Sequence, residues 1–323
     1  MKAMIHEKYG PAEVIRLAEV EKPAPHEGEV LVRVRAASLN AYDWHMLSAD
    51  IFLIRLMVGG LLRPKNTRLG ADVAGEVEAL GRGAEQFKPG EAVFGDLASF
   101  GGGSLAEYVA VPERAFARKP ANLSFEEAAA VPMAAVTALQ ALRDQGRIST
   151  GQKVLIHGAS GGVGTFAVQL AKYFGAEVTA VCSARNAEQA RALGADYVID
   201  YAREDFTRSG RQYDLILAVN GYHSLAAYRR ALAPGGSYVM AGGKPGQIFQ
   251  AVLLGKAMSG REGRQMGAVS AKLNPADLTF LRDLLEAGKI KPVIDRCYPF
   301  DQTAEAFRYL GAGHARGKIV VTL

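Results

Sequence analysis

The chain has few cysteines, and their spacing does not suggest a disulfide scaffold or a structural metal. Of its 323 residues only Cys182 and Cys297 are cysteines, and they lie far apart in the sequence. They form no CxxC pair and no metal-ligand spacing. A disulfide-rich fold is therefore excluded, and we expect a reducing, cytoplasmic location.

Long apolar runs and dense runs of charge are also missing. The start of the chain, Met1–Glu7, has no apolar signal core, and the longest apolar stretch, residues 51–62, is interrupted by Arg55 and by Gly59-Gly60. Such a stretch is too short to span a bilayer, so we expect no membrane span. The formal net charge is only +5, with no run of five basic residues. We therefore expect no nucleic-acid partner, and this charge suits an enzyme that binds an anionic cofactor.

The most informative motif is residues 153–164, Lys-Val-Leu-Ile-His-Gly-Ala-Ser-Gly-Gly-Val-Gly. Its β-branched and aliphatic start predicts a strand buried on both faces. After the small residues, apolar side chains recur at intervals of three and four, which predicts a helix that ends near Gly175. A strand, a glycine turn and a helix form the context that a dinucleotide-binding fingerprint requires.

The small residues of this turn have distinct physical roles. Gly161 lacks a Cβ and allows a pyrophosphate close to the backbone, while Gly164 allows the helix to pack tightly against the strand. The free N–H groups and the dipole of the first helical turn favour an anion. We therefore predict that the cofactor is bound by the turn, specifically by Ala159, Ser160, Gly161, Gly162, Val163 and Gly164. Since Ala159 replaces the first glycine of the usual pattern, an ordinary tight turn is the alternative.

The patterns on either side of this motif predict two domains. Residues 1–119 show many short alternating strands, and residues 288–323 return to that character after the intervening segment. Residues 120–287 alternate strands with helices, which predicts a doubly wound parallel sheet of the Rossmann type. The fold class is α/β, with a discontinuous β-rich domain that contains an inserted nucleotide-binding domain.

Two stretches interrupt the β-rich pattern. Residues 38–45 collect Asn40, Tyr42, Asp43 and His45 directly after a strand, which is typical of an active-site loop. The alternative, which does not exclude the first interpretation, is a helix start that Asn40 caps, with Asp43 as its partner. The second stretch, residues 51–62, is interpreted as an apolar lip over a pocket, with a helix or plain core as alternatives.

The end of the second Rossmann strand lacks the acid that an NAD site would place there. Its sequence is Cys-Ser-Ala-Arg-Asn, in which Ser183 and Arg185 suit a 2′-phosphate. Hydrogen bonds to charged groups contribute roughly 1.5–3 kcal/mol each, or roughly tenfold to a hundredfold in preference. We therefore predict NADP(H) as the cofactor, with Tyr201 as a further neighbour of the phosphate. A solvated helix start is the alternative for Arg185.

From end to end the chain resembles the medium-chain dehydrogenase/reductase superfamily, and most closely its zinc-free quinone oxidoreductase and zeta-crystallin branch. The resemblance rests on several stretches: Gly70–Val77, Pro132 with Thr137-Ala138, His157–Gly164, Leu193–Asp196 and Gly317–Val320. It implies that the β-rich domain is GroES-like and that the protein is a homodimer.

The resemblance also implies roles for single residues. Thr137 is expected on the nicotinamide side of the cofactor, with Gly242 and Gly243 close to it, and Asn274 lies in a segment that reaches the cofactor in similar proteins. Asn40 stands where zinc-dependent relatives have a cysteine ligand, and Ala71 where they have a histidine. A catalytic zinc needs three protein ligands. We therefore expect no metal.

Without a metal, hydride removal from a simple alcohol lacks a group that stabilises the alkoxide. A quinone or an α,β-unsaturated carbonyl spreads the incoming charge over its own oxygen and needs only orientation and a proton. We therefore predict an NADPH-dependent reductase of such small molecules, with Asn40, Tyr42 and His45 as candidate catalytic residues. Tyr42, His45 or ordered water supplies the proton. The alternatives are an enoyl-thioester reductase and a non-enzymatic relative that is structural or binds RNA.

Overall fold

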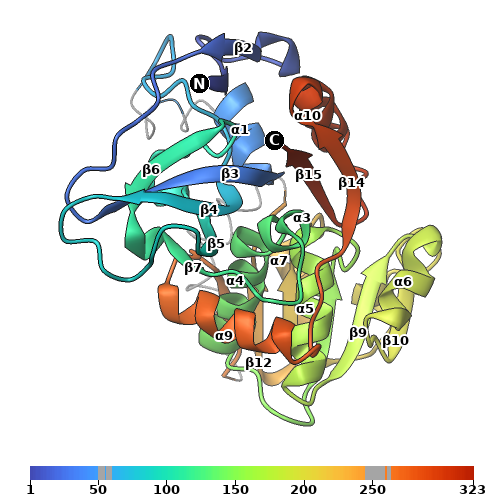
Figure 1. Ribbon diagram of the computed structural model, residues 1–323. Coiled ribbons are helices and arrows are strands. Elements are labelled where there is room, and N and C mark those ends of the chain that lie inside the picture. Colours follow the sequence, from blue (N-terminus) through green and yellow to red (C-terminus); the bar gives the residue numbers. More distant parts are fainter. Residues whose placement is uncertain (50–54, 56–59, 244–258, 260–262) are drawn as a thin grey trace. The chain divides into compact units, whose positions relative to one another are not determined.

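The computed structural model describes residues 1–49, 55, 60–243, 259 and 263–323, and Figure 1 shows it as a ribbon. Most of the apolar stretch 51–62, for which we expected a lip, a helix or core, lies outside the described residues. The chain forms two compact units. The first comprises Met1–Met133, Leu273–Gly288 and Pro292–Leu323, and the second comprises Ala134–Lys272 and Lys289–Lys291. We call them the β-rich unit and the nucleotide unit.

The β-rich unit is built on a sheet with the strand order β14-β15-β3-β4-β5-β7, in which β6 also pairs with β3. The long strand β3 is central because β4, β6 and β15 all pair with it in antiparallel fashion. The pairing of β15 with β3 places the C-terminal strand beside β3 (Figure 1). The strands are β1 (Lys2–Ile5), β2 (Arg16–Glu19), β3 (Glu29–Leu39), β4 (Asp72–Leu80), β5 (Ala92–Asp96), β6 (Tyr108–Pro112), β7 (Phe116–Arg118), β14 (Ile294–Pro299) and β15 (Lys318–Thr322).

Helices cover parts of this sheet and complete its core. They are α1 (Ala41–Ser48), α3 (Phe125–Ala129), α9 (Pro275–Glu286) and α10 (Thr303–Gly311). Leu39 of β3, Leu47 of α1, Phe307 of α10 and Val321 of β15 belong to one buried apolar cluster. This cluster fixes the start of α1 against the sheet, because burial of apolar area is the main driving force for packing.

The nucleotide unit contains a parallel sheet with the strand order β10-β9-β8-β11-β12-β13. The first strand in sequence, β8, lies at the centre, which is the doubly wound order. The elements are β8 (Lys153–His157), β9 (Glu177–Cys182), β10 (Tyr197–Asp200), β11 (Tyr213–Ala218), β12 (Leu232–Met240), β13 (Gln265–Ala268), α5 (Gly162–Tyr173), α6 (Ala187–Ala192) and α7 (Leu225–Ala231). Helix α4 (Pro132–Gln140), followed by a π-helical turn at Ala141–Gln145, begins in the β-rich unit and continues here.

The observed elements confirm the predicted fold class. The strand, glycine turn and helix of residues 153–175 are present, and Gly175 follows α5 with a φ of 80°. The compact units differ from the predicted domains at three segments, one of which is Lys289–Lys291, which groups with the nucleotide unit. Residues 120–133 and 273–287 group with the β-rich unit by their contacts, whereas the sequence pattern assigned them to the nucleotide-binding domain.

The turn between β8 and α5 depends on a close backbone approach at Gly164. A Cβ there would lie 2.1 Å from the carbonyl oxygen of Gly158 and 2.8 Å from the backbone of Ala159. At Gly161, by contrast, the nearest atom to such a Cβ would be 3.9 Å away. The two glycines therefore have different roles: one is required by packing, and the other leaves open space beside the turn.

We expect Gly164→Ala to lower the free energy of unfolding by about 1–3 kcal/mol, the usual effect of overpacking. Gly161→Ala is the matched control, because it adds the same methyl group to the same turn without a clash, and its effect should be clearly smaller. Denaturant unfolding followed by circular dichroism measures both. Equal losses in the two variants would contradict the assigned packing role.

Candidate active site

The end of β3 and the start of α1 position the three candidate catalytic residues. Asn40 stands at the N-cap of α1, and its backbone N–H donates to Oδ2 of Asp43 at 2.8 Å. The stretch 38–45 is therefore a strand end followed by a capped helix rather than a loop. Tyr42 and His45 lie on the first turns of α1 and are both half-buried.

The side chain of Asp72 is the centre of a buried hydrogen-bond network. Its Oδ2 accepts from Ser38 Oγ at 3.0 Å, from Asn40 Nδ2 at 2.9 Å and from Lys318 Nζ at 3.1 Å. Its Oδ1 accepts from the backbone N–H of Met133, in the first turn of α4, at 2.9 Å. Asp72 is fully buried and Lys318 is 3% exposed, so this is a buried ion pair. Strands β3, β4 and β15 and the start of α4 thus meet at one carboxylate.

This network does not fit the zinc that the resemblance associates with related enzymes. The amide oxygen of Asn40 accepts from Lys318 Nζ and its amide nitrogen donates to Asp72, so the side chain is already engaged. The side chain of Ala71 has no atom that could bind a metal. Among the described residues no group of three or more His, Cys, Asp or Glu side chains is arranged to hold a metal. The residues present place an ammonium beside Asn40, where a second cation would be repelled.

Two further carboxyl groups adjoin the ion pair. Asp96 lies opposite Asp72 in the register of β5 with β4, and Asp43 is 2% exposed. Burial, reinforced by the negative charge of Asp72, raises the pKa of Asp43 and that of Asp96 to about 7 in each case. Both groups therefore keep their protons to a higher pH than an exposed carboxyl group does. Burial, with Asp43 and Asp96 nearby, also raises the pKa of Tyr42 to about 12, so its hydroxyl is a donor at neutral pH.

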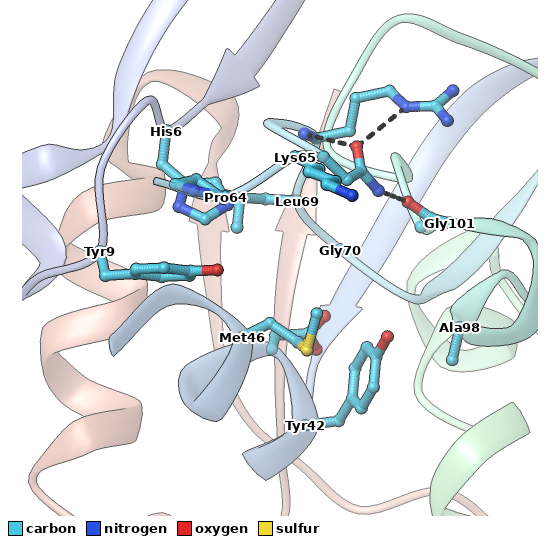
Figure 2. Close-up of a pocket in the computed structure, with 14 residues that line it drawn as sticks. His6, Tyr9, Tyr42, Met46, Pro64, Lys65, Leu69, Gly70, Ala98 and Gly101 are labelled. Carbon is cyan, nitrogen blue, oxygen red and sulfur yellow. Dashed lines mark hydrogen bonds between the residues drawn. The ribbon is translucent and has the colours of Figure 1, made fainter. Parts of the chain in front are cut away.

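A cavity of about 240 Å³ lies beside α1 (Figure 2). Tyr42 and Asp43 line it, and Figure 2 shows the hydroxyls of Tyr9 and Tyr42 directed toward its centre on either side of Met46. The other lining residues are His6, Pro64, Lys65, Asn66, Arg68, Leu69, Gly70, Ala98, Gly101 and Gly102. Asn40 and His45 do not line this cavity, so only Tyr42 of the three candidates meets it.

In the nucleotide unit, the turn after β8 is hydrogen-bonded to the next strand. The N–H groups of Gly158 and Ala159 donate to the carbonyl of Val181 at 3.1 and 3.2 Å. Gly158 has a φ of 90°, and Gly161 begins α5 as its N-cap. The open space beside Gly161 and the helix N-terminus behind it fit a pyrophosphate.

The residues predicted to bind a 2′-phosphate gather at the same sheet edge. Ser183 follows β9, the strand next to β8, and Arg185 lies exposed in the short helix after it. The N–H of Tyr201 donates to the carbonyl of Cys182 at 3.3 Å, which places Tyr201 beside the end of β9. The ring centroid of Tyr201 lies 6.4 Å from that of Tyr222.

The remaining predicted cofactor residues lie on separate elements. Gly242 and Gly243 follow β12, and Gly243 forms an isolated bridge with Gly221 after β11. Thr137 lies on α4 and is partly exposed. Asn274 caps α9 in the β-rich unit, where its Oδ1 accepts from the N–H of Ala276 at 2.9 Å. Gly242 and Gly243 thus follow a strand of the same parallel sheet as the glycine turn, and Asn274 has a structural capping role.

Sequence reasoning missed the two charged residues at the heart of the network. Asp72 and Lys318 lie in stretches that carry the family resemblance, but the sequence pattern gives neither residue a role. A charged residue inside an otherwise apolar strand was the available signal, because such charges are buried only when paired. It also missed His157, whose Nδ1 lies 2.8 Å from the Tyr228 hydroxyl and whose pKa burial lowers to about 3.

Family models match both parts of this architecture. The alcohol dehydrogenase GroES-like domain matches residues 26–121, and the zinc-binding dehydrogenase model matches residues 193–321. The chain is 34% identical to the chloroplast envelope quinone oxidoreductase homolog of Arabidopsis thaliana, over 99% of this chain and 98% of that protein. The chain belongs to the medium-chain dehydrogenase/reductase superfamily, in its quinone oxidoreductase-like branch.

Other members of the superfamily show the same likeness. The chain is 38% identical to 2-methylene-furan-3-one reductase of Solanum lycopersicum, over 99% of this chain and 79% of that protein. The structure of the quinone oxidoreductase from Coxiella burnetii matches with a TM-score of 0.89 and 30% identity, over 100% of this chain and 99% of that one. This protein is thus an oxidoreductase, and membership implies a nicotinamide cofactor and a small-molecule substrate. In the described part of the chain, no helix has the length and apolar character needed to cross a membrane.

The raised pKa values of Asp43 and Asp96 predict how stability depends on pH. Between about pH 4 and pH 7 the folded protein keeps protons that the unfolded chain releases, so the free energy of unfolding falls as the pH rises. Each carboxyl contributes a slope of at most about 1.4 kcal/mol per pH unit. We expect Asp43→Asn to flatten this decline in denaturant unfolding from pH 4 to pH 8. The exposed Asp301→Asn is the control, and identical pH profiles for wild type and Asp43→Asn would contradict the account.

Proposed function

We propose that this protein is an NADPH-dependent, zinc-independent reductase of quinones or α,β-unsaturated carbonyls. The observation that carries the proposal is the buried contact of Lys318 with Asn40 and Asp72. With the Asn40 amide engaged in that contact, the described residues around it offer no ligand set for a Lewis acid. An acceptor that stabilises the incoming charge through its own conjugation is the chemistry that such a site supports.

The cofactor assignment is supported by the edge of the parallel sheet. A bound nicotinamide supplies the hydride. The turn from Ala159 to Gly164 would hold the pyrophosphate, and Ser183 and Arg185 would hold the 2′-phosphate, with Tyr201 beside them. Asp200, on the neighbouring strand β10, accepts the N–H of Ala202 at 3.1 Å and lies 3.7 Å from Arg203, which offsets part of its charge. This favours NADP(H) over NAD(H).

The nicotinamide end is proposed to involve Thr137, with Gly242 and Gly243 close to it, and Asn274 is proposed only as part of a segment that reaches the cofactor. This part of the proposal rests on the family resemblance alone. The homodimer and the cytoplasmic location are likewise predictions from the sequence and the family.

Tyr42 is the best-supported proton donor for the acceptor. It lines the cavity beside α1, and its raised pKa keeps the hydroxyl protonated. The amide of Asn40 is already used by Lys318 and Asp72, which makes it a positioning residue. His45 does not line the cavity. A hydroxyl that donates to the carbonyl oxygen of the acceptor stabilises the enolate that forms there.

The size of the cavity favours a small acceptor over a long acyl thioester. Its volume of about 240 Å³ is below the roughly 300–1,000 Å³ typical of sites for drug-sized ligands. The name of the tomato relative describes reduction of a small exocyclic enone, which agrees with this preference.

We expect Arg185→Gln to lower the preference for NADPH over NADH by about tenfold, because it removes a charged hydrogen bond to the 2′-phosphate. The ratio of kcat/KM for the two cofactors is the quantity to measure. Arg211→Gln is the matched control, since Arg211 precedes β11 at the opposite end of the strands. A wild-type enzyme that prefers NADH would refute the cofactor assignment.

We expect Tyr42→Phe to lower kcat with a small quinone or enone by at least about tenfold, because general acids contribute roughly 10²–10⁴. Its affinity for NADPH should stay unchanged. Tyr108→Phe, on β6 outside the cavity, should behave as wild type. An unchanged kcat in Tyr42→Phe would assign the proton to His45 or to water, and a wild type that oxidises no NADPH with any acceptor would refute the proposed function.

A further inference from the structure

We propose that the cavity beside α1 binds an acceptor that carries a carboxylate, so that the substrates are small conjugated acids. This inference rests on the reductase function proposed above and names the substrate class. It follows from the charges, the unpartnered polar atom and the size of the cavity in the β-rich unit.

The accessible charges of the cavity are positive. Lys65 and Arg68 line it and are exposed, and no ion pair with either was found among the described residues. Asp43, the acid in the wall, is 2% exposed and accepts the N–H of Asn40, so little of its carboxylate faces a ligand. A ligand that enters therefore meets two cations and almost no exposed negative charge.

The local backbone holds one of these cations at the wall. Arg68 Nε lies 3.4 Å from Asn66 Oδ1, and the Asn66 amide donates to the carbonyl of Gly101. A Cβ at Gly101 would lie 3.3 Å from Arg68 Nη2, and the φ of 89° at Gly101 also favours glycine. The absence of a side chain at Gly101 thus leaves room for the guanidinium, which can bind a carboxylate through two parallel hydrogen bonds.

His6 is a second, independent sign of a polar ligand. It lines the cavity, is 1% exposed, and its Nδ1 has no hydrogen-bond partner among the described residues. Burial lowers the pKa of His6, so its ring is neutral at neutral pH, although the backbone groups of Lys8 and Asn66 partly oppose this shift. A buried polar atom without a partner is costly. In the tautomer that carries its proton on Nδ1, the ring would donate to a carboxylate oxygen of a bound ligand.

The remaining wall suits the conjugated part of such a ligand. Met46 and Leu69 supply apolar surface, and Tyr42 supplies a hydroxyl directed toward the centre (Figure 2). The hydroxyl of Tyr9 already donates to the carbonyl of Gly60 at 2.8 Å. The volume of about 240 Å³ suits a short monoanion better than a bulky phosphate ester.

The test compares 4-oxopent-2-enoate with its methyl ester, which differ in charge at one end of the same enone. In the double variant Lys65→Gln/Arg68→Gln, we expect the ratio of kcat/KM for acid to ester to fall about tenfold, with the ester changed less than twofold. Arg63→Gln is the matched control, because Arg63 is an exposed neighbour that does not line the cavity. Raising the ionic strength should lower the ratio in wild type only.

Equilibrium binding of 4-oxopentanoate, which lacks the conjugated carbon–carbon double bond of the enone, separates this inference from the proposed function. We expect about tenfold weaker binding in the double variant and in Met46→Trp, which fills the cavity. The inference would be overturned if both variants kept the wild-type ratio of kcat/KM for acid to ester and the wild-type affinity for 4-oxopentanoate. Turnover of the ester in that case would still support the reductase function. A third outcome is that wild type binds 4-oxopentanoate, both variants lose this binding, and neither the acid nor the ester is reduced. That outcome would support the carboxylate site in the cavity and refute the reductase function.

Discussion

The buried contact between Asp72 and Lys318 is the constraint on which the β-rich unit depends. One carboxylate receives donors from β3, from β15 and from the first turn of α4. Such pairs add little net stability over apolar residues, but loss of one partner is severe because the other charge stays buried. The pair therefore fixes the register of the strands, because β3 and β15 must both place a donor beside Asp72 of β4. The same contact holds Asn40 at the start of α1.

The same contact limits the chemistry. Lys318 holds the Asn40 amide, so the position that carries a metal ligand in zinc-dependent relatives contributes a fixed dipole instead. Under the proposed function, such a site supplies no Lewis acid to an alkoxide, and the proposed acceptor carries the developing charge itself. The nearby cavity offers a hydroxyl from Tyr42 and two basic side chains. In the proposed function, charge stabilisation thus comes from a conjugated substrate and from the hydrogen-bond donors around it.

Much of the fold was predictable because local signals agree with it. The run from Lys153 to Gly164 combines a buried strand, small residues and the start of an amphipathic helix. The strand pattern, the turn residues and the helical spacing all indicate the same turn. The sequence says little where long-range contacts decide the structure. Nothing near Lys318 in the sequence indicates that its ammonium meets Asp72, and nothing near His6 places it in a cavity wall with Tyr42. The segments 120–133 and 273–287 have helical patterns that suit either unit, and only tertiary contacts assign them.

A double-mutant cycle on Asp72→Asn and Lys318→Met tests the central claim most directly, with the free energy of unfolding as the readout. The account predicts that each single variant loses about 3–5 kcal/mol, since each leaves a buried charge without its partner. The double variant should lose clearly less than the sum, by at least about 1 kcal/mol of coupling. Additive losses, or single variants as stable as wild type, would contradict the claim that this contact organises the site.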